Sequence, residues 1–163
     1  MGFASLKRDL QNGPKRSLTV AWGLDSGVLR ACREALDQGL LAEVLVTGPA
    51  DKIEAVATDA GLNLQGFFIH AASTPEEGAA AAVRLIREGK SDLLMKGHLN
   101  TSVILRAVLN KEWGIRAQAL LSHIATIELP TGRLALLTDA AMNVKPDLIQ
   151  KSQILDNAIR FAW

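Results

Sequence analysis

The stretch 92–109, with the sequence DLLMKGHLNTSVILRAVL, brings a lysine, a glycine and a helix start together. Lys96 ends an apolar run, Gly97 follows it, and a polar residue within 100–102 can cap the next helix. A helix N-terminus offers free N–H groups to an anion, glycine permits close backbone approach, and lysine supplies a point charge. The segment therefore indicates phosphate binding, unless Lys96 is a surface lysine beside an ordinary turn.

Two further charged residues allow two interpretations each, a role in ligand binding and a structural role. Arg106, within the same predicted helix, could pair bidentately with phosphate or a carboxylate, or could be a solvated helix residue. Asp139 follows the apolar run of LALLTDAAMN at 134–143, so it is expected at the end of a strand. It could orient a ligand or a catalytic group there, or it could cap the turn by bonding to its own backbone.

The chain contains residues that suggest nucleophilic or metal chemistry, but their spacing does not support either. Ser122 and His123 could join Asp139 in a triad, yet adjacent residues on a strand point to opposite faces and G-x-S-x-G is absent. Cys32 lies on the apolar face of a predicted helix, which indicates a packed thiol. Three histidines and one cysteine show no zinc spacing, so we expect no metal, and the catalytic residues stay unknown.

Short apolar runs alternate with helical periodicity along the chain. The last predicted helix carries Leu148, Leu155, Ala158, Ile159 and Ala162 on one face. Thr74, Pro75 and Glu77 form a capping box that opens the third helix of the series. Strands are predicted at 17–22, 43–46, 67–70, 92–95, 122–128 and 133–137, and helices at 26–38, around 53–60, after 74, at 101–110 and at 147–162.

This alternation predicts an α/β protein, a three-layer α/β/α sandwich with parallel strands and crossover helices on both faces. The turn at 129–132 separates two strands as a hairpin, so the sheet is expected to be mixed, mostly parallel with a hairpin. Residues 1–163 are expected to form a single domain. Ligands of such sheets bind beyond the carboxyl ends of the strands, which selects 23–25, Gly48, 96–98 and 138–139 as a polar rim.

Composition limits the classes of partner. The net charge is +1, from 18 basic and 17 acidic side chains, which favours neither nucleic acid nor a membrane surface. Hydrophobic residues make up 48% and charged residues 21%, the balance of a globular protein. Residues 1–10 do not look like a signal peptide, and one cysteine allows no internal disulfide, so we expect a cytoplasmic protein.

Longer segments resemble the phosphate acetyl/butyryltransferase family, and its butyryl branch more closely. LLMKGHLNTSVILRAVLNKEWGIR at 93–116 is similar to the middle of these enzymes. The stretch 122–159, SHIATIELPTGRLALLTDAAMNVKPDLIQKSQILDNAI, resembles them more specifically, above all in TDAAMN followed by Pro-Asp-Leu. PKRSLTVAW and AEVLVTG also fit, so the likeness covers essentially the whole chain.

The resemblance implies the fold of the isocitrate/isopropylmalate dehydrogenase class and a site in a cleft between two domains. It implies reversible transfer of butanoyl, or a similar short acyl group, between CoA and inorganic phosphate. Acyl-CoA and phosphate are then substrates, no cofactor is needed, and the complete protein is expected to be a homo-oligomer. The cleft-facing motifs of the family fall on Lys96, Gly97, Thr101, Arg106, Ser122, Asp139 and Asn143.

Family members are roughly twice as long as these 163 residues. The second half of the family's fold supplies the other cleft wall, and it is expected to be absent here. Attack of phosphate on a thioester needs both partners oriented and the oxyanion stabilised. We therefore expect this chain to be inactive alone. The alternatives are a non-catalytic module that binds CoA or phosphate, a phosphate acetyltransferase, and a metal-dependent dehydrogenase, which the lack of clustered metal ligands argues against.

Overall fold

A computed structural model describes residues 2–116 and 120–162. The chain divides into two compact units, which are treated separately. The sheet unit comprises Leu10–Arg116, and the hairpin unit comprises residues 1–9 with 117–163. That the whole chain forms a single domain stays a prediction.

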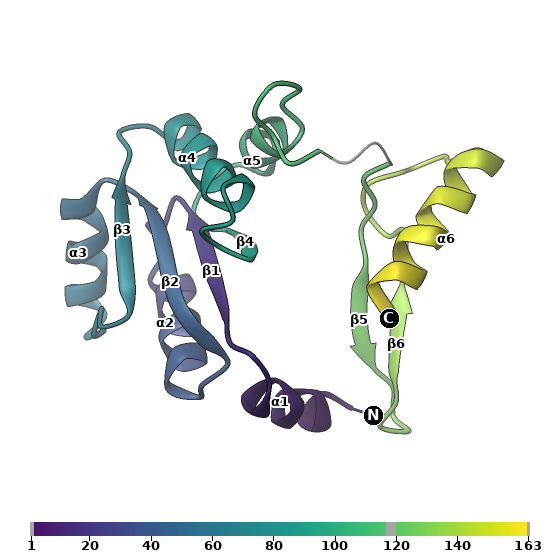
Figure 1. Cartoon of the computed structure of the whole chain (residues 1–163), viewed down its shortest axis with the longest axis horizontal. Coiled ribbons are helices and arrows are strands. Elements are labelled where there is room, and N and C mark those ends of the chain that lie inside the picture. The colour runs from purple at the N-terminus through teal and green to yellow at the C-terminus, as the bar shows by residue number, and fades with distance from the viewer. Residues whose placement is uncertain (1, 117–119, 163) are drawn as a thin grey trace. The chain divides into compact units, whose positions relative to one another are not determined.

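Four parallel strands form the centre of the sheet unit, in the order β3-β2-β1-β4 (Figure 1). Because parallel neighbours need crossover connections, each successive strand is reached through a helix. The strands are β1 (Arg16–Ala21), β2 (Leu41–Gly48), β3 (Phe67–Ala71) and β4 (Leu93–Lys96), and the helices are α2 (Ser26–Asp37), α3 (Ala50–Asp59), α4 (Pro75–Arg87) and α5 (Thr101–Val108).

Alternate side chains of the strands face two separate cores. Val20 of β1, with Val44 and Val46 of β2, packs with buried residues of α2 and α3. On the other face, Ala21 and Trp22 pack with α4 and α5. Successive strand residues point to opposite sides of a sheet, so helices must cover both faces. The expected α/β/α layering is therefore confirmed in the sheet unit.

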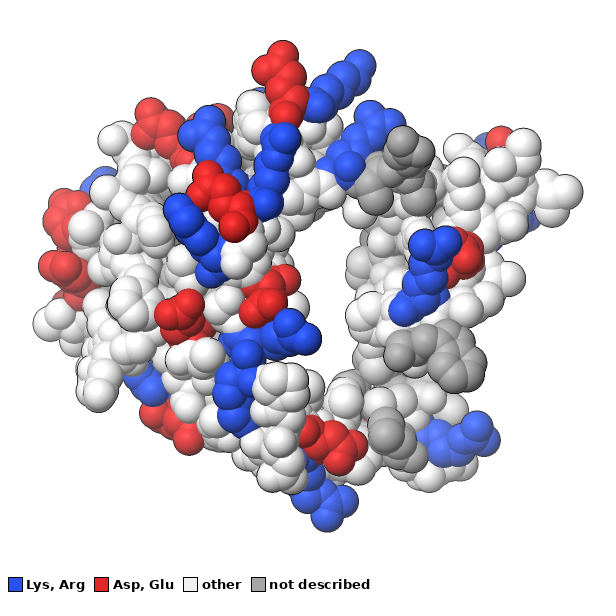
Figure 2. Space-filling model, in the orientation of Figure 1, with Lys and Arg blue, Asp and Glu red and all other residues white. Residues whose placement is uncertain are grey.

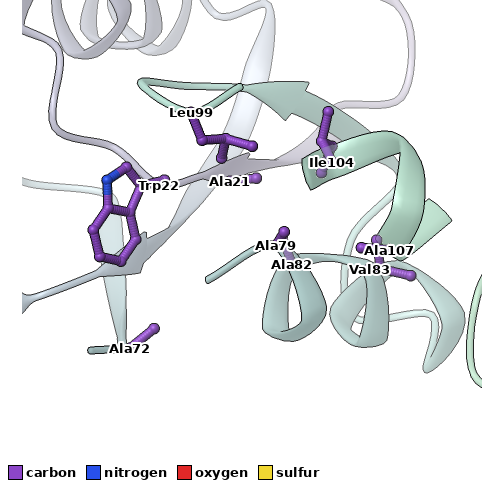
Figure 3. Close-up of a cluster of buried hydrophobic side chains, with 9 residues drawn as sticks. All are labelled: Ala21, Trp22, Ala72, Ala79, Ala82, Val83, Leu99, Ile104 and Ala107. Carbon is purple, nitrogen blue, oxygen red and sulfur yellow. The ribbon is translucent and has the colours of Figure 1, made fainter. Parts of the chain in front are cut away.

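Helix α4 begins where the sequence indicated. The backbone N–H of Glu77 donates to Thr74 Oγ1 at 3.2 Å, and the Glu77 carboxylate accepts from Ser73 N at 2.8 Å. Pro75 stands in the first turn, where its missing N–H costs nothing. Small residues on the inner face of α4 let it lie close to β1 and α5, as Figure 3 shows for Ala79 and Ala82.

The hairpin unit contains two antiparallel strands, β5 (Ala125–Glu128) and β6 (Leu134–Leu137), and the helix α6 (Leu148–Ala162). Gly132, at φ 74°, supplies the left-handed backbone that the tight turn between the strands requires. A first helix, α1 (Phe3–Asn12), precedes β1 in the chain.

Three expectations about the elements are wrong. The hairpin forms a two-stranded sheet of its own among the described residues, so the sheet is not mixed. Ser122 and His123 lie outside β5, which begins at Ala125. Of the apolar face predicted for the last helix, Ala158 is buried, whereas Leu148 is 84% and Leu155 59% exposed. Helix α1 was not predicted, although Phe3, Leu6 and Leu10 recur at helical spacing.

Charge is dispersed on the surface, in keeping with the net charge of +1. Figure 2 shows basic and acidic side chains interspersed over the face in view, with few of either on the hairpin unit. None of the helices described for 2–116 and 120–162 is long and apolar enough to cross a lipid bilayer.

Candidate functional site

The carboxyl end of the sheet is held together by a buried threonine. Thr47 Oγ1, fully buried at the end of β2, accepts a hydrogen bond from Trp22 N at 3.0 Å and donates to Gly78 O at 2.9 Å. Trp22 follows β1 at φ 63°, a conformation that a bulky residue rarely adopts. Such strain persists only where the surroundings fix it, and Thr47 provides part of that restraint.

Gly97 is required at the end of β4 because two backbones meet there. Its N–H donates to Ala21 O at 2.9 Å, and the next N–H, from His98, donates to Trp22 O at 2.8 Å. A Cβ at position 97 would lie 2.4 Å from Trp22 O and 2.7 Å from Ala21 O. The close approach seen at Gly97 is between two backbones, those of the β4–α5 loop and the end of β1, and close approach to an anion stays a prediction.

A polar hollow of about 500 Å³ opens at this edge, and we call it the anion hollow. Lys96 lines it, and its Nζ donates to Leu99 O at 3.0 Å and Gly97 O at 3.3 Å. An ammonium has three N–H donors, so these bonds leave one for a ligand. Asn100, the N-cap of α5, makes no side-chain capping bond, so the first N–H groups of the helix are also available.

Carboxylates share the anion hollow and shape its charge. Asp25 caps α2 by accepting from Val28 N at 2.9 Å, and its other oxygen lies 4.0 Å from His98 Nδ1. Glu76, in the first turn of α4, lines the same hollow. An anion is therefore favoured next to Lys96 and the start of α5, and disfavoured on the side of Asp25 and Glu76.

The hairpin unit holds a second cluster of polar side chains, joined by hydrogen bonds. Asn143 Nδ2 donates to Asp139 Oδ2 at 2.6 Å and to Leu121 O at 3.0 Å. Asn157, on α6, donates to Ser122 Oγ at 2.9 Å and to Leu120 O at 2.8 Å. Asp139 and Asn143 are therefore in contact, and Asn157 anchors Ser122 in the same segment.

Asp139 is surrounded by donors. Its Oδ1 accepts from the backbone N–H groups of Met142 at 2.8 Å and Ala141 at 3.0 Å, and its Oδ2 accepts from His123 N at 3.2 Å. Partial burial raises the pKa of Asp139, but these N–H groups and the Asn143 amide together hold it well below its usual range. The turn-capping role considered for Asp139 is thus present, and a ligand role stays a prediction.

This lowered pKa predicts a pH-dependent contribution to stability. The Asp139 carboxylate stabilises the fold above the unfolded-state pKa of about 3.9, and that contribution disappears as the pH falls through the folded-state value. Asp139→Asn should therefore lower the urea midpoint at pH 7 and have a somewhat smaller effect at pH 3, where the loss of the carboxylate's contribution has only begun, as measured by far-UV circular dichroism. Asp59→Asn, an exposed residue at the end of α3, is the matched control. Equal losses at both pH values would contradict the prediction.

The structure brings the seven predicted residues into separate places. Lys96 and Gly97 line the anion hollow, and Thr101 is exposed in the first turn of α5. Arg106 lines a smaller neighbouring hollow. Ser122, Asp139 and Asn143 belong to the hairpin unit. A further hollow there, of about 520 Å³ and lined by Leu6, Thr126, Arg133, Leu134, Leu136, Phe161 and Ala162, includes none of the seven.

Sequence reasoning missed three residues that line or support these places. Glu76 and Trp113 line hollows beside α5, and Asn157 holds Ser122. Glu76 could have been found from the helix start at Pro75, because α4 begins at the same edge of the sheet. Cys32, in contrast, is confirmed as a packed side chain, and burial raises the pKa of its thiol to about 11.

The described residues therefore form an α/β protein with a polar hollow beyond the carboxyl ends of its parallel strands, where this class binds small ligands. Residues 70–163, more than half of the chain, match the family described as phosphate acetyl/butaryl transferase. The chain belongs to this family, as the resemblance of its motifs predicted.

Individual relatives of known name agree with this family assignment. The chain is 40% identical over 151 residues to a probable phosphate butyryltransferase of Bacillus subtilis, covering 90% of the chain and 48% of the relative. It is 39% identical over 141 residues to a phosphate acetyltransferase of Rhizobium meliloti, covering 86% and 44%. A branched-chain phosphotransacylase structure from Enterococcus faecalis superposes with a TM-score of 0.78 at 26% identity, over 90% of this chain and 51% of that one.

The chain spans about half the length of the curated relatives it matches. The matching structure is a phosphotransacylase, which agrees with the α/β class. The narrower expectation of an isocitrate/isopropylmalate dehydrogenase-like fold stays a prediction.

Proposed function

We propose that this protein serves an acyl transfer in which butanoyl-CoA and inorganic phosphate give butanoyl phosphate and CoA. The observation that carries the proposal is the anion hollow, where Lys96, Gly97 and the start of α5 meet. Membership of the phosphate acetyl/butaryl transferase family supports acyl transfer as the chemistry at that hollow. The name of the Bacillus subtilis relative supports butanoyl as the acyl group.

In this transfer a phosphate oxygen attacks the thioester carbonyl carbon. The new O–C bond forms, the C–S bond breaks, and the CoA thiolate leaves and takes up a proton. The free N–H of Lys96 and the first N–H groups of α5 would hold the phosphate and orient its oxygen. CoA and phosphate are substrates here, and the proposal requires no metal or other cofactor.

The remaining predicted residues keep proposed ligand roles. Arg106 suits an additional phosphate or carboxylate of the substrates, because a guanidinium can bind either bidentately. Thr101 offers a hydroxyl beside the first turn of α5. For Ser122, Asp139 and Asn143 the support is the Asn143–Asp139 and Asn157–Ser122 hydrogen bonds, and the place of all three within residues 70–163, which match the family.

The Rhizobium relative favours a second candidate, with acetyl in place of butanoyl as the transferred group. A non-catalytic module that binds CoA or phosphate is the alternative if no turnover occurs. We further propose a cytoplasmic protein that forms a homo-oligomer when complete.

A thiol-release assay tests the proposal directly. Butanoyl-CoA and acetyl-CoA are each mixed with phosphate, and free CoA is followed for the 163 residues and for any longer form of the protein. We expect faster release from butanoyl-CoA by the longer form and little release by the 163 residues, which span about half of their relatives. If neither form releases CoA and phosphate still binds, the result would contradict acyl transfer and favour the binding module.

A further inference from the structure

A second, mostly apolar hollow lies beside the anion hollow in the sheet unit. It has a volume of about 150 Å³ and lies between α4, α5 and the loop after α5. Ala80, Val103, Ala107 and Trp113 supply its apolar wall, and we call it the apolar hollow. The two hollows share Glu76 and Val103, so they adjoin at these two side chains.

One face of α5 connects the two hollows. Val103, Arg106, Ala107 and Asn110 recur at helical spacing and all line the apolar hollow, and Asn100, one turn before Val103, lines the anion hollow. The helix rises about 1.5 Å per residue, so Val103 and Ala107 lie about 4.5 and 10 Å along it from Asn100. A short chain attached to a phosphate held at Asn100 would therefore run along this face.

Small side chains and a fixed indole determine the size of the apolar hollow. Ala107 is 5% exposed and belongs to the buried cluster between α4 and α5 that Figure 3 shows. Arg84 covers the Trp113 ring at 5.5 Å, and the backbone N–H of Trp113 donates to Asn110 Oδ1 at 3.1 Å, so both the ring and the backbone of this residue are held. The loop of Trp113 is also tied to α4, because Arg87 donates to Glu112 O at 2.6 Å.

The volume suits a short alkyl chain. An apolar cavity of about 150 Å³ can hold a benzene ring of six carbons, so a butanoyl group fits. Arg84 already occupies one face of the Trp113 ring, which disfavours stacking of a base on that face. Each methylene buried in such a site strengthens binding about fourfold, so the two that distinguish butanoyl from acetyl give about fifteenfold.

We propose that the apolar hollow is the acyl-chain subsite, and that Ala80, Val103, Ala107 and Trp113 set the preferred chain length. This inference rests on the proposed function, because the phosphate of the acyl phosphate must occupy the anion hollow.

The test compares ligands that differ only in their chain. Binding of inorganic phosphate, acetyl phosphate and butanoyl phosphate to the 163-residue protein is measured by isothermal titration calorimetry. We expect butanoyl phosphate to bind about fifteenfold tighter than acetyl phosphate. Ala80→Leu, at a half-buried wall position, should reduce that preference to within about twofold and leave inorganic phosphate affinity unchanged.

Two further variants make the result specific. Trp113→Ala removes the outer wall and should weaken the preference without filling the hollow, so the test does not depend on one substitution. Ala55→Leu, the same change at an exposed position of α3, should preserve the preference of about fifteenfold. If phosphate binds and the preference is absent, or survives both wall variants, the subsite is overturned and the proposed function stands. If inorganic phosphate does not bind, the proposed role of the anion hollow in phosphate binding is overturned. The acyl-chain subsite, which depends on that role, is then overturned as well.

Discussion

Lys96→Ala is expected to lower phosphate-dependent CoA release about a hundredfold in any form of this protein that turns over butanoyl-CoA. The ammonium would bind an anionic phosphate through a charge-assisted hydrogen bond, and such bonds contribute about 1.5–3 kcal/mol. About 2.7 kcal/mol corresponds to a hundredfold in rate. Initial rates at several phosphate concentrations, with circular dichroism to check the fold, measure the effect.

The design separates a ligand role of Lys96 from its role in the loop. Its Nζ also holds Gly97 O and Leu99 O, so alanine could disturb the loop. Lys96→Arg keeps the charge, and a rate that recovers partly in this variant would indicate electrostatic binding. Lys90→Ala removes an exposed lysine that pairs with Glu88 at 2.8 Å, and it should leave the rate unchanged. A wild-type rate in Lys96→Ala would remove the residue from the proposed site.

Gly97→Ala is expected to destabilise the fold by about 3 kcal/mol or more. The added methyl would meet backbone oxygens of β1 at 2.4 and 2.7 Å, and backbone cannot rotate away as a side chain can. Forced repacking of this kind costs about 1–3 kcal/mol and more where the neighbours are rigid. Urea unfolding followed by circular dichroism gives the free energy of unfolding.

A second glycine substitution provides the comparison. Gly27→Ala lies in α2, where the nearest atom to the new Cβ is the flexible Asp25 Oδ1 at 3.1 Å. In a helix this change should be neutral or stabilise by about 0.4–1 kcal/mol. If both variants unfold at the same urea concentration, the close approach at Gly97 does not constrain the fold as described.

The parallel sheet was predictable because its strands are short apolar runs. SLTVAW, VLV and DLLM alternate with helical periodicity, and the local signals agree with the global pattern. The hairpin was also recognisable from Pro130 and Gly132. Its separation from the main sheet was not, because pairing partners between distant strands are set by packing, which periodicity along the chain does not record.

The candidate site was predictable only where the chain itself places residues together. Lys96 and Gly97 are adjacent, and the end of an apolar run marks their position at the edge of the sheet. Trp113 and Glu76 are far apart in sequence, and the helices α4 and α5 make them neighbours of one hollow. The exposed apolar face of α6 shows the opposite limit, since an amphipathic pattern predicts a buried face and cannot say what buries it.

The unequal distribution of buried side chains has a consequence for folding order. In the described residues every buried apolar side chain except Ile154 and Ala158 belongs to the sheet unit, and Val144 and Ile149 of the hairpin unit are 91% and 72% exposed. Regions with few buried contacts open at a small free-energy cost, whereas densely packed ones open only in global unfolding. We therefore expect the hairpin unit to open before the sheet unit unfolds, and to be the last part of the chain to become ordered on folding.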